Sequence, residues 1–263
     1  MSSARSVIAF VGLNFEARIA AGPGVQVVCR ETASDLAGPL GDAIKRGCRS
    51  IISFGIAGGL APHLRPGDWI VASSIIDSGK RKPTDPEWSR KLLKTIPRAG
   101  FAAVAGVDAP VSDPSVKREL HCKTGAVAID MESHLVARIA AAHALAFAAV
   151  RVIVDPAHRS VPAAALAGMR SDGSTDASAV LRALVAAPSE VLGLMRLAAD
   201  AFFARNSLQR GRRLLGPGLG LSDAGHAEHS GVAAPVGGLR EAGILSGIGG
   251  HIPTSLAAEK LLA

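Results

Sequence analysis

The sequence contains no tyrosine, and its aromatic residues are limited to seven phenylalanines and two tryptophans among 263 residues. It therefore offers no aromatic platform on which nucleic-acid bases could stack, and no basic helix is evident, so nucleic acid is not expected as a partner. The three cysteines, Cys29, Cys48 and Cys122, are scattered and odd in number. They predict neither a disulfide framework nor a zinc site, and they suit a reducing cytoplasm. His226 and His229 lack partner cysteines, so neither a metal nor another cofactor is expected.

Long hydrophobic runs are also missing. The longest, residues 139–150, is interrupted by His143 and is too short to span a bilayer. Residues 7–11 are too few for the apolar region of a signal peptide and favour a first strand. A cytoplasmic protein is therefore expected, with the inner face of the membrane as one location. The net charge of +7 favours contact with anionic lipid surfaces. Arginine enrichment from a GC-rich coding sequence explains the same charge equally well.

Apolar strand-like runs alternate with helical segments over most of the chain, which predicts an α/β fold. Strands are expected at residues 7–11, 25–29, 50–54, 69–76 and 102–107, and helices at 35–46, 89–95 and 188–203. Beyond about Asn206 the composition becomes glycine-rich and lacks aromatic residues. We therefore expect one domain over residues 6–205 with three αβα layers and a central mixed sheet. Residues 206–263 are expected to form a poorly ordered tail with a short helix near its end.

Two segments near the middle of the chain each bring carboxylates to the end of an apolar run. Asp130 and Glu132 follow residues 126–129, and Asp155 follows residues 147–154. The Ala-rich stretch between them has helical composition, so the order predicts a right-handed crossover between parallel strands. Acids at the carboxyl ends of such strands are candidates for chemistry. Helix capping, or pairing with the nearby arginines, explains the positions of Glu132 and Asp155 equally well.

Two further segments complete a recognisable set. Residues 53–60 (Ser-Phe-Gly-Ile-Ala-Gly-Gly-Leu) follow an apolar pair, and residues 7–16 run from a strand into Gly-Leu-Asn-Phe-Glu. With the two acidic segments, in this order, they resemble the nucleoside phosphorylase and methylthioadenosine/S-adenosylhomocysteine nucleosidase superfamily over roughly residues 6–200. Segments 78–81, 105–108, 124–126, 155–157 and 170–173 make the chain most similar to its hopanoid-associated branch, the adenosylhopane nucleosidases. That resemblance implies a homo-oligomer, because family members usually dimerise or form larger rings.

The resemblance also implies roles for individual residues. Asp155 matches the acid that protonates the departing purine, and Glu16 matches the acid that activates water. Glu132 matches the carboxylate that binds the ribose hydroxyls, and Met131 the residue that packs on the sugar. Val111 matches a position whose backbone contacts the purine, although Pro110 replaces the family's neighbouring aromatic residue. The turn that approaches the sugar or an anion would consist of Gly55, Ala57, Gly58 and Gly59.

Cleavage of a purine N-glycosidic bond passes through an oxocarbenium-like transition state, which needs an acid, a ribose-binding group and a nucleophile. Ser53 and Ile56 stand where phosphorylases carry phosphate ligands, so hydrolysis is favoured over phosphorolysis, although Arg18, Lys80 and Arg81 leave phosphate open. Adenosylhopane is the expected substrate. Methylthioadenosine, S-adenosylhomocysteine or another purine nucleoside are the enzymatic alternatives, and nucleoside binding without turnover is the non-enzymatic one.

A pentacyclic 5′ substituent requires an apolar opening beside the ribose. We expect residues 78–88, which are polar and broken by prolines, to form a loop at this opening, together with the apolar residues 161–169. Packing of residues 161–169 on the sheet as an amphipathic helix is the commoner arrangement for such a segment.

Overall fold

The computed structural model describes residues 7–30, 37–168 and 176–221. Within them the strands form one eight-stranded mixed sheet. They are β1 Val7–Val11, β2 Val25–Cys29, β3 Ser50–Gly59, β4 Trp69–Asp77, β5 Lys80–Pro83, β6 Gly100–Gly106, β7 Ala128–Asp130 and β8 Ala146–Asp155. The predicted mixed sheet with flanking helices is confirmed, and β1 and β2 have the predicted bounds.

The helices separate and follow these strands. They are α1 Asn14–Ala20, α2 Ala37–Lys45, α3 Pro86–Thr95, α4 Pro114–Thr124, α5 Ser133–Ala142, α6 Ala163–Ala167, α7 Ala177–Ala186 and α8 Val191–Leu215, with the 3₁₀ segments η1 Pro188–Glu190 and η2 Pro217–Gly220. Aspartates cap α3, α4 and α7 by accepting backbone N–H groups of the first turn: Asp85, Asp113 and Asp176.

The strand pairings close on themselves. β3 pairs with β7, β7 with β6, β6 with β4, β4 with β8, and β8 again with β3. The predicted parallel crossover between β7 and β8 is wrong, because β7 runs antiparallel to β3 while β8 runs parallel to it. The two strands do not pair with each other. The three-residue β7 instead pairs in parallel with β6. The carboxyl ends of β7 and β8 therefore reach the same region from different sides of the closed sheet.

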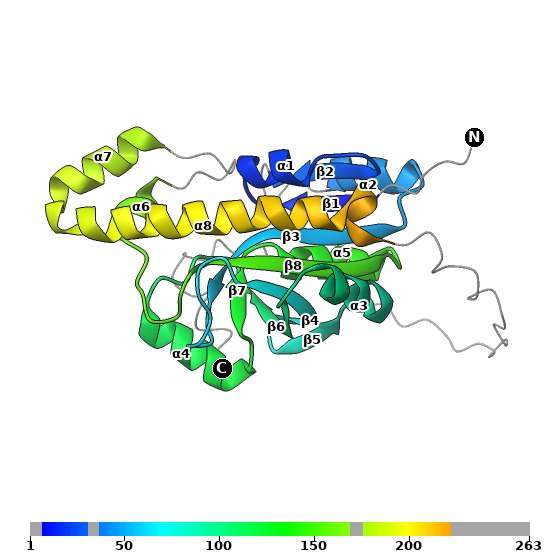
Figure 1. The fold of residues 1–263 in the computed structure, drawn as a ribbon, viewed down its shortest axis with the longest axis horizontal. Helices are drawn as coiled ribbons and strands as arrows, with labels where there is room; N and C mark the ends of the chain where they lie inside the picture. The colour runs from blue at the N-terminus through cyan, green and yellow to red at the C-terminus, as the bar shows by residue number, and fades with distance from the viewer. Residues whose placement is uncertain (1–6, 31–36, 169–175, 222–263) are drawn as a thin grey trace, which may run out of the picture.

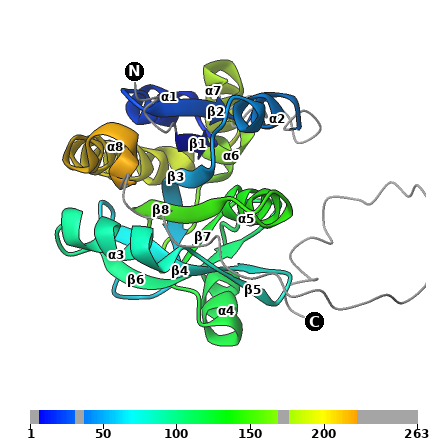
Figure 2. The same ribbon diagram turned by 90° about the vertical axis from the view of Figure 1, so that its right-hand side faces the viewer.

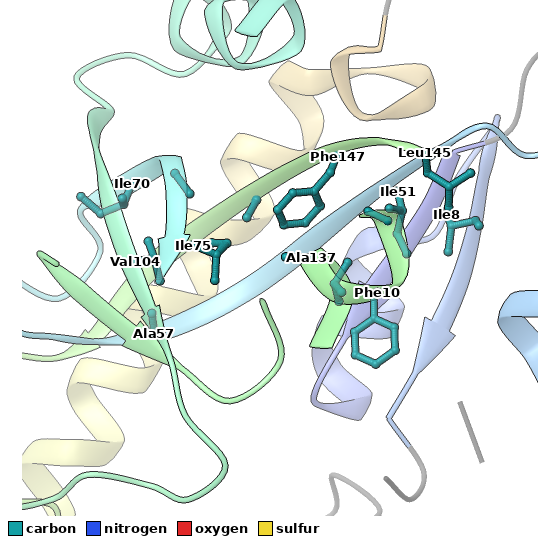
Figure 3. Close-up of a cluster of buried hydrophobic side chains, with 14 of the residues drawn as sticks. Ile8, Phe10, Ile51, Ala57, Ile70, Ile75, Val104, Ala137, Leu145 and Phe147 are labelled. Carbon is teal, nitrogen blue, oxygen red and sulfur yellow. The ribbon is translucent and has the colours of Figure 1, made fainter. Parts of the chain in front are cut away.

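Alternating residues of each strand face two helical layers. In β1, Ile8 and Phe10 belong to the cluster that includes α2 and α5, whereas Val7, Ala9 and Val11 belong to the cluster that includes α1, α3 and α8. Figure 2 shows α3 and α8 on one side of β3 and β8, with α2 and α5 on the other. Figure 3 shows the first cluster, in which Phe10 and Phe147 lie among aliphatic side chains. The three-layer arrangement follows from this period-two burial.

The expected boundary at residue 205 is wrong, because it falls inside α8. This helix runs on to Leu215 and lies along the length of the molecule in Figure 1. Leu208, Leu215 and Leu219 are fully or almost fully buried in the core. Trp88 Nε1 donates to Leu219 O at 3.0 Å, which ties η2 to α3. The leucines of this glycine-rich segment thus belong to the domain, and the predicted tail from residue 222 and its short helix lie outside the described residues.

Among the described residues, no single helix has the length and apolarity needed to cross a bilayer. α7 together with η1 and α8 meets that criterion only as a pair, and the pair is bent by 116°.

Candidate active site

A half-open cavity of about 380 Å³ lies where β3, β7 and β8 end. Four carboxylates contribute to its lining: Glu16, Asp130, Glu132 and Asp155. Apolar side chains from α1, α6 and α8 complete the wall, among them Phe15, Leu166 and Leu197. Within the described ranges, no cluster of His, Cys, Asp and Glu could hold a metal ion. The chemistry of the cavity therefore depends on how each carboxylate is partnered.

Glu16 extends from α1 toward β3. Its Oε2 accepts hydrogen bonds from the backbone N–H groups of Gly12 and Leu13, at 3.0 and 2.9 Å, and its Oε1 accepts one from Ile56 at 2.7 Å. Burial, reinforced by the Glu132 carboxylate, raises the pKa of Glu16 to about 7. A carboxylate has about four acceptor positions, so three backbone donors leave space for one further partner.

The glycine-rich segment 55–59 belongs to β3, so the expected turn is wrong. A Cβ on Gly55 would overlap the Glu16 carboxylate, and a Cβ on Gly58 would lie 3.2 Å from Asp155 Oδ1. These glycines therefore let the acids approach the strand backbone closely. The glycines were correctly interpreted as positions where another group approaches the backbone closely. The groups that approach Gly55 and Gly58 are the protein's own carboxylates, Glu16 and Asp155.

Glu132 lies at the start of α5, and its carboxylate faces Gly12 so closely that a Cβ there would collide with it. Arg30 Nη1 lies 3.5 Å from Glu132 Oε1 and donates to Met131 O at 3.3 Å. Burial, with the neighbouring Asp130, raises the pKa of Glu132. Glu132 and Met131 both line the cavity. The structure thus brings the expected ribose-binding pair beside Glu16.

Asp130 belongs to a buried ion-pair network beneath the cavity. Its Oδ2 accepts from Arg151 Nε at 2.7 Å and from Ser133 Oγ at 2.6 Å. Arg151 Nη2 also donates to Ser53 Oγ at 2.5 Å and to Ser133 Oγ at 2.9 Å. Despite the cost of burial, Arg151 and these hydrogen bonds lower the pKa of Asp130. Sequence reasoning did not identify this network, and Ser53 is fully engaged in it.

Asp155, at the end of β8, forms an ion pair with Lys117, which sequence reasoning missed. The Lys117 side chain has no solvent exposure, and Nζ also donates to Arg159 O at 3.0 Å and Pro156 O at 3.4 Å. Burial raises the pKa of Asp155, and Lys117 opposes part of that rise. No sequence signal marks Lys117, because it occurs in the polar sequence of α4, where a solvent-facing lysine is the usual outcome.

The arginines expected to compete for Glu132 and Asp155 are engaged elsewhere. Arg151 pairs with Asp130, and Arg138 pairs with Asp77 through Nε at 2.7 Å. The alternative that these arginines neutralise Glu132 and Asp155 is therefore wrong, although Glu132 is the N-cap residue of α5.

The remaining predicted positions divide into two groups. Those that line the cavity are Val111, Ala57, Gly58, Val161, Ala165 and Leu166. Those that do not are Gly55 and Gly59, and the segment 78–88. The expected loop 78–88 is wrong, because it contains β5 and the start of α3 on the sheet. The charged strand β5 pairs antiparallel with β4 at the edge of the sheet. Met169 and the segment 170–173 lie outside the described residues.

Cations near the cavity are already partnered. Arg30 contacts Glu132, Lys117 pairs with Asp155 and Arg151 pairs with Asp130. The lining contributed by the described residues contains no lysine or arginine, and Arg18, Lys80 and Arg81 do not reach it. Buried carboxylates with raised pKa values suit proton transfer near neutral pH, and their charge disfavours a second anion.

The comparisons with known proteins agree with this architecture. The family model described as "Phosphorylase superfamily" matches residues 33–186. No curated protein matches the chain in sequence. The futalosine hydrolase of Helicobacter pylori superposes with a TM-score of 0.57 at 15% identity, covering 81% of this chain and 96% of that one.

Two nucleosidases superpose similarly. The 5′-methylthioadenosine/S-adenosyl homocysteine nucleosidase of Helicobacter pylori has a TM-score of 0.58 at 13% identity, covering 81% of this chain and 97% of that one. The Campylobacter jejuni enzyme of the same name has a TM-score of 0.52 at 13% identity, covering 78% and 99%. At these identities the similarity establishes a shared fold.

Proposed function

The chain belongs to the phosphorylase superfamily, and from that membership we propose that it hydrolyses the N-glycosidic bond of a purine nucleoside with an apolar 5′ substituent. The observation that supports this most directly is the meeting of Glu16, Glu132 and Asp155 around one cavity. Each has a pKa raised chiefly by burial. The fold shared with nucleosidases and a futalosine hydrolase is consistent with this reaction.

In the proposed reaction, Asp155 donates a proton to the departing purine while the bond between the base and C1′ breaks. Glu132 accepts hydrogen bonds from the ribose hydroxyls, and Met131 packs on the sugar. Glu16 uses its remaining acceptor position to hold a water molecule, which adds to C1′ and gives a proton to the carboxylate. The products are the free base and the ribose with a hydroxyl at C1′. Val111 is assigned to the purine and Ala57 and Gly58 to the sugar, as the resemblance implies.

Water is the proposed nucleophile because the described residues around the cavity offer no uncommitted cation. Among them, three cations lie near the carboxylates, and each is already bound to one of these acids. Ser53, at a position where phosphorylases hold phosphate, accepts hydrogen bonds from Ser133 and Arg151 in the buried network. A phosphate ion would therefore face uncompensated negative charge.

The leading substrate is adenosylhopane, with release of adenine in hopanoid biosynthesis. The volume of about 380 Å³ lies near the lower end of the ~300–1,000 Å³ typical of ligand sites. It suits a nucleoside, so a pentacyclic substituent would extend past the apolar residues of α6 and α8 toward a membrane surface. Methylthioadenosine, whose 5′ group is small, is the second candidate, and it requires no such exit. A homo-oligomer remains a prediction.

Adenine release from each nucleoside, measured with and without phosphate, tests the proposal. We expect release from adenosylhopane without phosphate, and its loss in Asp155→Asn but not in the exposed control Asp42→Asn. Strict dependence on phosphate would overturn hydrolysis. Faster cleavage of methylthioadenosine would transfer the assignment to that substrate, and purine binding with no release in any condition would indicate a binding protein.

A further inference from the structure

The exposed apolar residues of the described chain concentrate on two helices. Eight of the nine large hydrophobic side chains with high exposure lie on α7 or α8, and Phe101 on β6 is the exception. We define the outer face by the seven that lie on α7 or on the N-terminal half of α8: Leu181, Val185, Val191, Leu192, Met195, Phe202 and Phe203. In Figure 1, α7 and the N-terminal part of α8 project at one end of the molecule. α7 has no buried residue at all.

The N-terminal half of α8 is apolar on two opposite sides. At 3.6 residues per turn, Leu197, Ala201 and Ala204 share the side that faces the cavity and the core. Leu192, Met195 and Phe202 lie on the opposite side and are 57%, 65% and 62% exposed. Apolar side chains on two opposite sides of a helix normally pack against a partner on each side. The outer face therefore presents apolar area suited to a partner.

The charge around the outer face is positive. Arg196, Arg210 and Arg213 lie on the outward side of α8, and no carboxylate of the described residues forms an ion pair with them. The acids of α8 and η1 are engaged: Asp200 pairs with Arg159, and Glu190 accepts the backbone N–H of Ala164. Arginines spaced along the same side of a helix as exposed apolar side chains complement an anionic lipid surface. A two-fold contact with a second copy would instead bring these arginines toward their equivalents.

The outer face and the cavity lie on opposite sides of the same helix, α8. Leu197 and Ala201 line the cavity from one side of α8, while the outer face occupies the other. The diameter of a helix, about 10 Å, therefore separates the nucleoside site from whatever covers the outer face.

We propose that the outer face of α7 and α8 docks on an anionic lipid bilayer. Its apolar side chains enter the headgroup boundary, the flanking arginines contact acidic headgroups, and the cavity is held next to the apolar phase. The biological role of this docking rests on the proposed function, because an enzyme that acts on a lipid-linked nucleoside takes its substrate from the bilayer. The docking itself requires only the surface.

Co-sedimentation of the full chain with vesicles tests it. The vesicles contain phosphatidylcholine alone, or phosphatidylcholine with one third phosphatidylglycerol. We expect binding to the second kind only, weakened by salt. The variant Leu192→Ser/Met195→Ser/Phe202→Ser should bind at least about 100-fold more weakly, and Arg196→Gln/Arg213→Gln should lose the preference for acidic lipid. The matched control is Phe101→Ser, whose side chain is 54% exposed on β6, and it should bind normally.

Two results would overturn the docking. One is wild-type protein that stays in the supernatant with acidic vesicles. The other is a triple variant that still binds them. Sedimentation velocity provides a further check: a dimer that dissociates in the triple variant, without a vesicle effect, would assign the face to a second copy. Adenine release from adenosylhopane and from methylthioadenosine, measured for each variant, tests the proposed function apart from the vesicles. Vesicle binding with no release from either nucleoside refutes the function and not the docking.

Discussion

Two kinds of carboxylate meet in one small region of this protein, and they differ in their partners. Asp130 also lines the cavity, but it belongs to a buried network with Arg151 and two serines, and its pKa is lowered. Glu16, Glu132 and Asp155 face the cavity, and burial raises the pKa of each. The first kind stays ionised and forms a buried ion pair that stabilises the fold. Acids of the second kind hold a proton more readily than an exposed carboxyl does, and Glu16, with a pKa of about 7, can exchange one near neutral pH.

The difference teaches that burial alone does not decide what an acid does. All four acids are largely removed from water, but only Asp130 accepts hydrogen bonds from an arginine, a hydroxyl and two backbone N–H groups together. Asp155 is intermediate, because Lys117 compensates part of its desolvation. Substitutions in each group should therefore separate activity from stability.

The largest effect is expected for Asp155→Asn. Removal of the acid should lower turnover by about 10²–10⁴-fold, equivalent to about 3–5 kcal/mol of barrier. The amide oxygen still accepts a hydrogen bond from Lys117, but the buried ammonium loses its counter-charge, so the thermal midpoint should fall as well. Adenine release and thermal unfolding, measured on the same preparation, check both parts. Wild-type turnover would remove Asp155 from the mechanism.

Arg151→Met should show the opposite pattern, with a large loss of stability. Removing one partner of a buried pair costs about 3–5 kcal/mol because Asp130 is left charged and unpaired. Urea unfolding measures the loss. The exposed pair of Lys45 and Asp42 supplies the control, since Asp42→Ala should cost less than about 0.5 kcal/mol. If Arg151→Met unfolds at the wild-type urea concentration, Asp130 is not a structural acid.

Glu16 should make stability depend on pH. Its folded pKa of about 7 exceeds the ordinary 4.5, so the folded state binds the proton more tightly. The resulting stabilisation is fully present below pH 4.5 and is lost as the pH rises through 7. The span is about 3 kcal/mol. Glu16→Gln should remove this slope from the difference between unfolding free energies at pH 5 and pH 8. An unchanged slope would contradict the raised pKa.

The smallest effect is expected for Lys117→Met. This variant tests whether Lys117 makes Asp155 intermediate between the ion-paired Asp130 and the acids with raised pKa values. Without the ammonium, the pKa of Asp155 rises further, so its protonated form persists to higher pH. The alkaline limb of the rate profile should therefore move to higher pH. Lys117→Arg, which keeps the charge, is the matched control and should leave the limb in place. A downward shift would contradict the assigned role.

The sequence predicted the fold class and several strands because those features depend on local patterns. Val7–Val11 and Val25–Cys29 are short apolar runs bounded by polar or glycine residues, and both form strands with those bounds. The relation of β7 to β8 was not predictable, because it is set by the pairing of β7 with β6 and β3. Such pairings bring together segments far apart in sequence.

The site was predictable as a set of acids but not as a set of pairs. Glu16, Glu132 and Asp155 were placed by their position after strands and by resemblance, and all three line the cavity. Lys117 comes from a different helix, and nothing in its local sequence distinguishes it from an exposed lysine. The buried leucines of α8 and η2 escaped notice for a related reason, because glycines around them resemble the composition of a disordered segment.

The closed circuit of strands has a consequence for the protein's solubility. Closure of β3, β7, β6, β4 and β8 leaves β2 and β5 as the edge strands of the described sheet. β5 has the sequence Lys-Arg-Lys-Pro, and charge and proline both discourage a foreign strand from adding there. β2 has the sequence Val-Gln-Val-Val-Cys and lacks both kinds of protection. Any aggregation by strand addition should therefore begin at β2, and a lysine placed in that strand would suppress it.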